Sequence, residues 1–353
     1  MKRASRFVAA LAVLSYLLTG CAGSAQPAAS VFSGDTVVTS GASVAAVYRA
    51  LDDSSADAYV AATLLDPRQS VGASQPCLKT DNSMASRPSP LANPPLAALS
   101  IAQRARLVES LVSYELALAS FAGGAPRLES SLAASQLQRA VFEFAAAANA
   151  HAQGDLFVED LAAQFNAIAA KLAVASGAGD ARRIALDANP TIAKLLAVLA
   201  HDVSQKHAEA LAASRSAIAL WLAYYAAARR AAAPGGAMAV PANVSMPRCQ
   251  ETAFSPDDTS KIVDDSATDG ATFPGRDVVL ARLRAADERD EALRAADPAS
   301  VVSALSALND ALLKALASSP PGDDGSVGSA LLHLRTSVQS LAAACRPLQG
   351  TSF

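Results

Sequence analysis

The chain has 353 residues, of which 52% are apolar but only 5% aromatic, and its formal net charge is -3. A weakly acidic balance argues against nucleic acid or anionic lipid headgroups as the main partner. Long alanine tracts favour helices, and the scarcity of strand-forming residues leaves little material for a sheet. We therefore expect an all-α protein.

The first residues have the pattern of a bacterial export signal. Lys2, Arg3 and Arg6 form a basic head, and an apolar run follows from residue 7 to residue 18. The run is shorter than the roughly 20 residues that a membrane-spanning helix needs. Residues 1–20 are therefore interpreted as a signal peptide and not as a membrane span.

The apolar run ends in Leu18-Thr19-Gly20-Cys21, which resembles the lipobox of bacterial lipoproteins. The resemblance implies cleavage between Gly20 and Cys21, acylation of Cys21, and anchoring of the protein in a lipid bilayer through that residue. It also favours the outer over the inner membrane, because Ala22 stands where an aspartate retains enteric lipoproteins in the inner membrane. The alternative is an ordinary secretory signal in which Cys21 is incidental.

The remainder divides into a tether and one helical domain. Residues 21–42 are rich in Ala, Ser and Gly, which is typical of a flexible tether. We expect the folded domain at 43–349. Within its first half, apolar spacing and the positions of Gly and Pro predict helices at about 43–65, 96–121, 128–150 and 155–176. The proline-rich residues 66–95 cannot sustain a helix and are expected to form a long irregular loop.

The longest predicted helix begins at Asn189-Pro190 and ends near residue 233. The asparagine can cap a helix and the proline can occupy its first position. Near the end of this helix, residues 217–228 are apolar on every side and include Trp221, Tyr224 and Tyr225. Because this segment is too short to cross a bilayer, we expect a buried central helix.

A second irregular loop is expected at about 234–275, followed by helices at 276–296, 299–317 and 326–345. Asp297-Pro298 either starts a new helix or kinks one helix that runs through 276–317. The predicted architecture is an up-and-down bundle of about seven helices with two long irregular loops. Four helices separate the two loops, so both loops should leave the same end of the bundle.

Three cysteines, Cys77, Cys249 and Cys345, remain for one disulfide in an oxidising compartment. All three pairings are open. We favour Cys77 with Cys249, because both lie in irregular segments while Cys345 sits on the apolar seam of the last helix and can be buried. If 276–317 is one kinked helix, Cys345 should reach the same end of the bundle as the other two.

No catalytic, cofactor-binding or metal-ligating set emerges from the sequence. His201 and His207 are six residues apart and lie on different helix faces, and the acidic residues 257–269 lack the ligand spacing of a calcium loop. Asp290 and Arg294 have i, i+4 spacing, so the charged residues around them are interpreted as a solvated, salt-linked helix face. No motif of a hydrolase or nucleotide-binding protein is present.

Three functions follow, in order of preference. The first is a non-enzymatic envelope lipoprotein whose helical body is a scaffold or docking module for an envelope protein, facing the periplasm or the cell surface. The second is a binder of an apolar ligand or lipid between helices, through Trp221, Tyr224 and Tyr225. The third is an envelope hydrolase.

Overall fold

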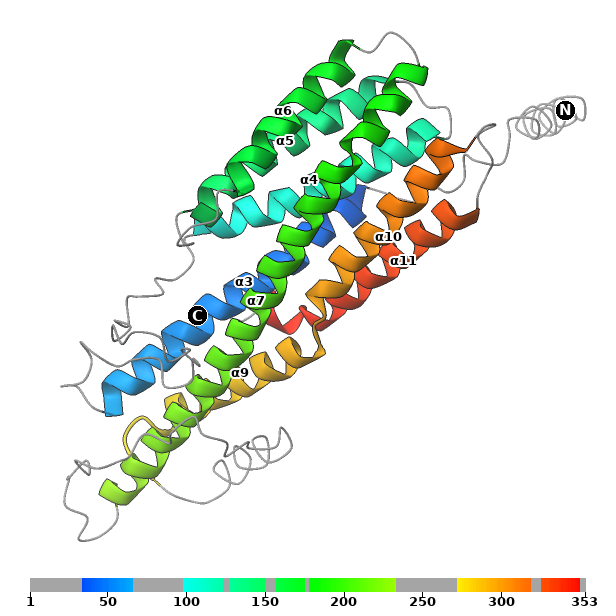
Figure 1. Cartoon of the computed structure of the whole chain (residues 1–353). Coiled ribbons are helices and arrows are strands. Elements are labelled where there is room, and N and C mark those ends of the chain that lie inside the picture. The colour runs from blue at the N-terminus through cyan, green and yellow to red at the C-terminus, as the bar shows by residue number, and fades with distance from the viewer. Residues whose placement is uncertain are drawn as a thin grey trace, which may run out of the picture.

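Figure 1 shows the computed structural model of the chain, which describes residues 34–65, 98–122, 127–149, 157–174, 178–232, 272–318 and 325–349. These residues form α-helices and one short 3-10 turn and contain no strand, so the all-α prediction is confirmed. The elements are α3 (Gly34–Leu65), α4 (Ala98–Ala122), α5 (Arg127–Asn149), α6 (Phe157–Val174), α7 (Ala178–Ala232), α9 (Arg276–Ala295), α10 (Pro298–Ala317), α11 (Gly325–Ala344) and η1 (Pro347–Gln349).

Successive helices from α3 to α7 run antiparallel, as expected of an up-and-down bundle (Figure 1). Side-chain contacts join each neighbouring pair, and α3 and α7 run parallel because four helix reversals separate them. Their shared direction brings the end of α3 and the end of α7 together at one end of the bundle, which we call the distal end. The contacts that join the helices are Tyr48 with Arg104, Arg106 with Glu143, Gln138 with Asn166, and Gln164 with Thr191.

Helix α3 begins earlier than predicted, so the proposed tether at 21–42 is wrong from Gly34 onward. Gly and Ser residues that suggested a tether serve close packing instead. A Cβ atom at Gly41 would lie 2.8 Å from the carbonyl oxygen of Ala105, so α3 and α4 approach too closely there for a larger residue. Ser40 and Ser43 are buried and donate hydrogen bonds to carbonyls of their own helix. Packing therefore overrides weak helix propensity.

Helix α7 corrects a second prediction, because it runs without interruption through Pro190. It has 55 residues and a length of about 80 Å at 1.5 Å per residue. The proline removes one backbone hydrogen bond, yet its ring is exposed and the buried stripe continues on both sides. That stripe comprises Ile184, Ala188, Ile192, Leu195 and Leu199. Core packing on one face thus holds the helix together across the proline.

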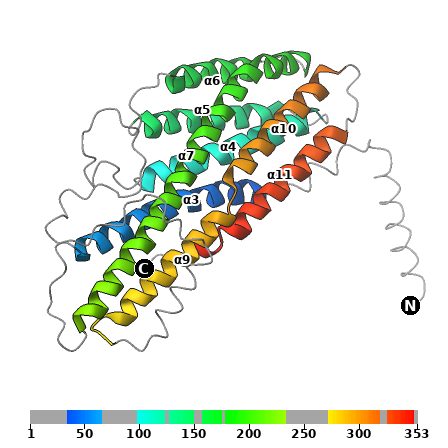
Figure 2. The same cartoon turned by 60° about the horizontal axis from the view of Figure 1, so that its bottom comes forward.

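The alternatives at Asp297-Pro298 are both partly right. The backbone breaks between α9 and α10, where Asp297 accepts a hydrogen bond from the Ser300 amide at 3.1 Å and Pro298 opens the new helix. Both helices nevertheless run antiparallel along α7 in one unbroken register, and we call them the α9–α10 arm (Figure 2). The register is fixed by contacts between Arg182 and Ser318, Asn189 and Asn309, His207 and Leu293, and Ser214 and Ala286.

One of these contacts caps the end of α9. The last carbonyls of a helix have no partner within it. The Leu293 carbonyl oxygen is such a group, and it lies 2.7 Å from Nε2 of His207, which donates to it in the tautomer protonated at that atom. His207 of α7 therefore satisfies a carbonyl group that the break between α9 and α10 leaves without a partner.

We expect His207→Leu to lower the free energy of unfolding by about 1–2 kcal/mol, because it leaves the Leu293 carbonyl without its donor. His201→Leu is the matched control, since His201 is an exposed residue of the same helix. Urea unfolding of both variants checks the prediction. Equal stabilities for the two variants would show that the contact contributes nothing.

Candidate functional site

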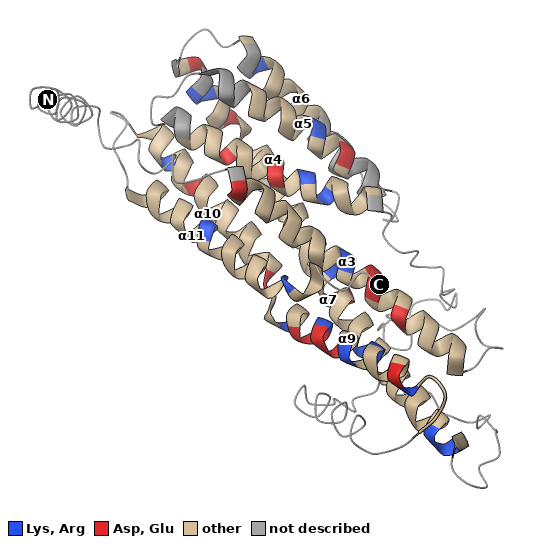
Figure 3. Ribbon diagram, turned by 180° about the vertical axis from the view of Figure 1, so that it is seen from behind, with Lys and Arg blue, Asp and Glu red and all other residues tan. Residues whose placement is uncertain are grey.

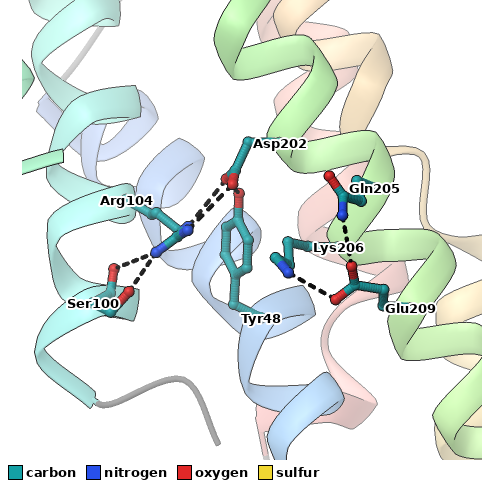
Figure 4. Close-up of polar contacts among 7 residues, drawn as sticks. All are labelled: Tyr48, Ser100, Arg104, Asp202, Gln205, Lys206 and Glu209. Atoms are coloured by element: carbon teal, nitrogen blue, oxygen red, sulfur yellow. Dashed lines mark hydrogen bonds and ion pairs between the residues drawn. The ribbon is translucent and has the colours of Figure 1, made fainter. Parts of the chain in front are cut away.

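A buried polar network joins α3, α4 and α7 in the middle of the bundle (Figure 4). Arg104 of α4 forms two hydrogen bonds with Asp202 of α7, from Nε to Oδ2 at 3.0 Å and from Nη2 to Oδ1 at 3.2 Å. Tyr48 of α3 donates its hydroxyl to the same Oδ2 at 2.5 Å. Ser100, one turn before Arg104, accepts a hydrogen bond from Nη1. Each of the three helices therefore contributes to one network.

The charge of Arg104 is enclosed by its partners. Its side chain is only 2% exposed, and its guanidinium carbon lies 5.4 Å from the ring centre of Tyr48 and 5.8 Å from that of Phe144. Burial alone would lower the pKa of Arg104, but the Asp202 carboxylate and, to a smaller extent, Tyr48 together outweigh it and raise that pKa. Burial, followed by the charge of Asp202, raises the pKa of Tyr48 well above its usual value. The arginine thus stays charged and the tyrosine neutral.

The network has the properties of a structural junction. Both carboxylate oxygens of Asp202 are engaged by Arg104 or Tyr48, so these three side chains link α3, α4 and α7. Two turns further along α7, Glu209 accepts hydrogen bonds from Lys206 at 2.7 Å and Gln205 at 2.9 Å (Figure 4). A buried, charged cluster of this kind fixes which residues of the three helices face one another.

A second cluster corrects the prediction of a solvated charged face around Asp290. Charged residues are dense on α9, as Figure 3 shows, but Arg289 and Asp290 are buried. Asp57 of α3 accepts hydrogen bonds from Arg289 at 2.9 Å and from Arg282 at 3.0 Å. The predicted pair of Asp290 with Arg294 is confirmed at 2.8 Å. Arg289 and Asp290 are buried because α9 packs against both α3 and α7, whereas Arg284, Glu288 and Glu291 are exposed as predicted.

The electrostatics of this second cluster follow from burial. Burial raises the pKa of Asp290, although Arg294 and Arg215 oppose the shift. Burial also raises the pKa of Asp53, against the attraction of Arg289. Asp57 lies between two guanidinium groups, and the three charged side chains connect α3 to the start of the α9–α10 arm.

The three aromatic residues proposed to contact an apolar ligand lie at the distal end. Trp221 and Tyr225 are buried in a second, smaller core formed by α3, α7 and α9, and Tyr224 packs against it. The rings of Trp221 and Tyr224 meet edge to face with centres 6.0 Å apart, and Tyr225 meets Phe273 in the same way at 5.3 Å. The prediction that residues 217–228 are buried is confirmed in part, because Ala226 is exposed and several of the others are only half-buried.

An exposed apolar surface lies beside that core, because α4 packs against only the first half of α3. Tyr59, Val60 and Leu64 of α3 are 48%, 44% and 45% exposed, and Val278 of α9 is 63% exposed. Val278 stands one turn before Arg282, the partner of Asp57, so it belongs to the same end of the bundle. We call these four residues the distal patch.

The cysteine predictions are tested only in part. Cys345 is fully buried in the larger core, as expected of an apolar residue, and burial raises its pKa to about 12. It does not reach the distal end, because α11 is about half as long as the α9–α10 arm and ends beside the junction of α9 and α10 (Figure 2). Cys77 and Cys249 lie outside the described residues, so their proposed pairing stays a prediction.

Gly20, Cys21, the acidic residues 257–269 and most of the two predicted loops also lie outside the described residues. Within the described ranges, no group of three or more His, Cys, Asp or Glu side chains could hold a metal ion. Among the same residues, one segment, Arg276–Ala317, is long and apolar enough to pass for a membrane span. It forms the α9–α10 arm, and core helices of soluble proteins meet the same test.

Comparisons of the chain with protein-family models, with curated proteins and with solved structures give no match.

Proposed function

We propose that this protein is a non-enzymatic bacterial envelope lipoprotein whose helical body docks another envelope protein through the distal patch. The observation that carries the proposal is the patch itself: Tyr59, Val60 and Leu64 face solvent within six residues of α3, and Val278 of the adjacent α9 is exposed at the same end of the bundle. Single exposed apolar residues are ordinary, whereas neighbouring ones mark interaction sites. The Asp57 cluster beside it fixes the two helices that present the patch.

The location is supported by the sequence. The motif Leu18-Thr19-Gly20-Cys21 supports anchoring through acylated Cys21, and Ala22 favours the outer membrane. The partner we propose presents an apolar helix face, since the patch is itself the side of two helices. The weakly acidic chain argues against nucleic acid as that partner.

The test compares a patch variant with a surface variant elsewhere. Tyr59→Ser combined with Val60→Ser and Leu64→Ser should abolish a cross-linked complex that the wild-type protein forms with one defined envelope protein in intact cells. Phe142→Ser is the control, because Phe142 is 69% exposed but belongs to α5, which packs against α4 and α6. Complexes are identified by mass spectrometry after cross-linking, and circular dichroism checks that both variants keep the wild-type helix content.

The proposal fails if the patch variant keeps the complex, or if Phe142→Ser removes it equally.

The second candidate, an apolar ligand held between helices, draws its support from the aromatic cluster around Trp221, whose indole nitrogen is buried without a hydrogen-bond acceptor. A change in the fluorescence of this single tryptophan on addition of extracted envelope lipids would favour that candidate instead.

A further inference from the structure

Glu115 is a buried carboxyl group in the apolar seam of α4. Its side chain is fully buried, and neither carboxylate oxygen has a hydrogen-bond partner. It lies on the same helix face as Leu111 and Leu118, one turn away on either side, and both of these are buried in the larger core. A carboxylate in such surroundings loses its hydration without replacement, which is costly.

The contrast with Arg104 shows how unusual this position is. Arg104 occupies the same face three turns earlier and is satisfied by Asp202, Tyr48 and Ser100. Glu115 has no comparable set of partners among the described residues. The adjacent Tyr114 is also buried, and its hydroxyl has no hydrogen-bond partner either, so it does not supply a donor to Glu115.

The charged groups of the helices around α4 do not compensate for Glu115. On α10, Asp310 is close enough to repel it, and Lys314, one turn further along, is exposed. On α3, the nearest acidic residue by register is the exposed Asp35. On α5, Glu143 is paired with Arg106, more than two turns away along α4, and Arg139 is exposed. The surroundings of Glu115 are thus apolar or acidic.

Burial, with a smaller contribution from Asp310, raises the pKa of Glu115 to about 8. The group therefore holds a proton in the packed bundle at neutral pH, whereas a solvated glutamate would have lost it. Any opening that hydrates the side chain releases this proton. By linkage, raising the pH must favour the opened form.

We propose that Glu115 is a proton-operated latch between α4 and α10. The two helices remain packed while the carboxyl group is protonated, and they separate locally when it ionises. The direction follows from the two protonation states. The packed form is favoured most below the ordinary glutamate pKa of about 4.5 and loses its advantage as the pH rises to about 8; above that value the equilibrium no longer changes.

Hydrogen exchange measured by mass spectrometry at pH 5.5, 6.5, 7.5 and 8.5 tests the latch. Glu115→Gln provides a neutral side chain at every pH, and comparison with it at the same pH cancels the intrinsic pH dependence of exchange. In α4 and α10, the exchange rate of the wild type relative to this variant should rise by up to about tenfold per pH unit between 5.5 and 7.5 and then level off. Glu115→Leu is a second neutral reference, should the glutamine variant fold poorly.

Two further variants separate the latch from a general effect of charge. Asp310→Asn removes the repulsion, so the levelling off should move to lower pH. Glu143→Gln removes an acidic group of α5 and should leave the wild-type profile unchanged. A wild-type ratio that is the same at all four pH values would overturn the proposal, as would a rise of equal size in α5 and α6.

Discussion

Asp202→Asn is expected to lower the free energy of unfolding by about 3–5 kcal/mol, because it leaves the buried guanidinium of Arg104 without a counter-charge. The packing around Arg104 offers no substitute, since its contacts with Tyr48 and Phe144 are with ring faces. Tyr48 would also lose the negative acceptor of its hydroxyl. Urea unfolding at pH 7 measures the loss.

Two controls distinguish the cost of leaving a buried charge unpaired from the cost of losing any ion pair. Glu209→Gln disrupts the more exposed pair with Lys206 on the same helix and should change the stability by less than about 1 kcal/mol. The double variant Arg104→Leu with Asp202→Leu removes both charges and should recover much of the loss, because an apolar pair can replace a buried ion pair. A loss below 1 kcal/mol for Asp202→Asn would contradict this account of the network.

Asp57→Asn should have a similarly large effect, about 3–5 kcal/mol, because it leaves Arg289 buried without its carboxylate partner. The loss should be concentrated in α9, which Asp57 ties to α3. Hydrogen exchange should therefore accelerate most in α9 and at the end of α3. Urea unfolding gives the total loss, and the exchange of individual helices gives its distribution.

The two arginines of this cluster should differ in their contributions. Arg282 is 40% exposed, so Arg282→Leu should cost about 1 kcal/mol or less. Asp277→Asn, at the almost fully exposed Asp277 of the same helix, is the control and should have no measurable effect. If Asp57→Asn and Asp277→Asn were equally stable, the buried cluster would not contribute to stability.

The sequence was sufficient to predict the helices whose limits are set by local chemistry. Asp297 and Pro298 gave the start of α10 because a side-chain cap and a fixed proline φ act within one turn. The apolar spacing in α4 gave its limits to within about two residues for the same reason. The parallel arrangement of α3 and α7 followed from counting helix reversals.

Features that depend on contacts between distant residues were not predictable in this way. Pro190 has every local mark of a helix start, and only the stripe buried against neighbouring helices shows that α7 continues through it. Gly41 suggested a tether because only its local composition is visible in the sequence. Its role is to let α4 approach α3 closely, which depends on a distant segment. The sequence alone does not show whether a glycine provides flexibility or close packing, or whether a proline ends a helix or lies within one.

The buried charges were missed for a related reason. Asp290 and its neighbours have the spacing of a solvated face, and burial comes from α3 and α7, which sequence spacing on α9 cannot show. A usable signal existed in α4, where Arg104 and Glu115 occupy positions of the apolar stripe. Charged residues at seam positions predict a buried polar site, although they do not identify the partner.

The account depends most on attachment of the body to a membrane through Cys21, and the mass of the mature protein isolated from membranes tests this directly. We predict an N-terminal peptide that begins at Cys21 and carries fatty acyl groups. A mature protein that begins elsewhere, or begins at Cys21 with an unmodified mass, would contradict the account.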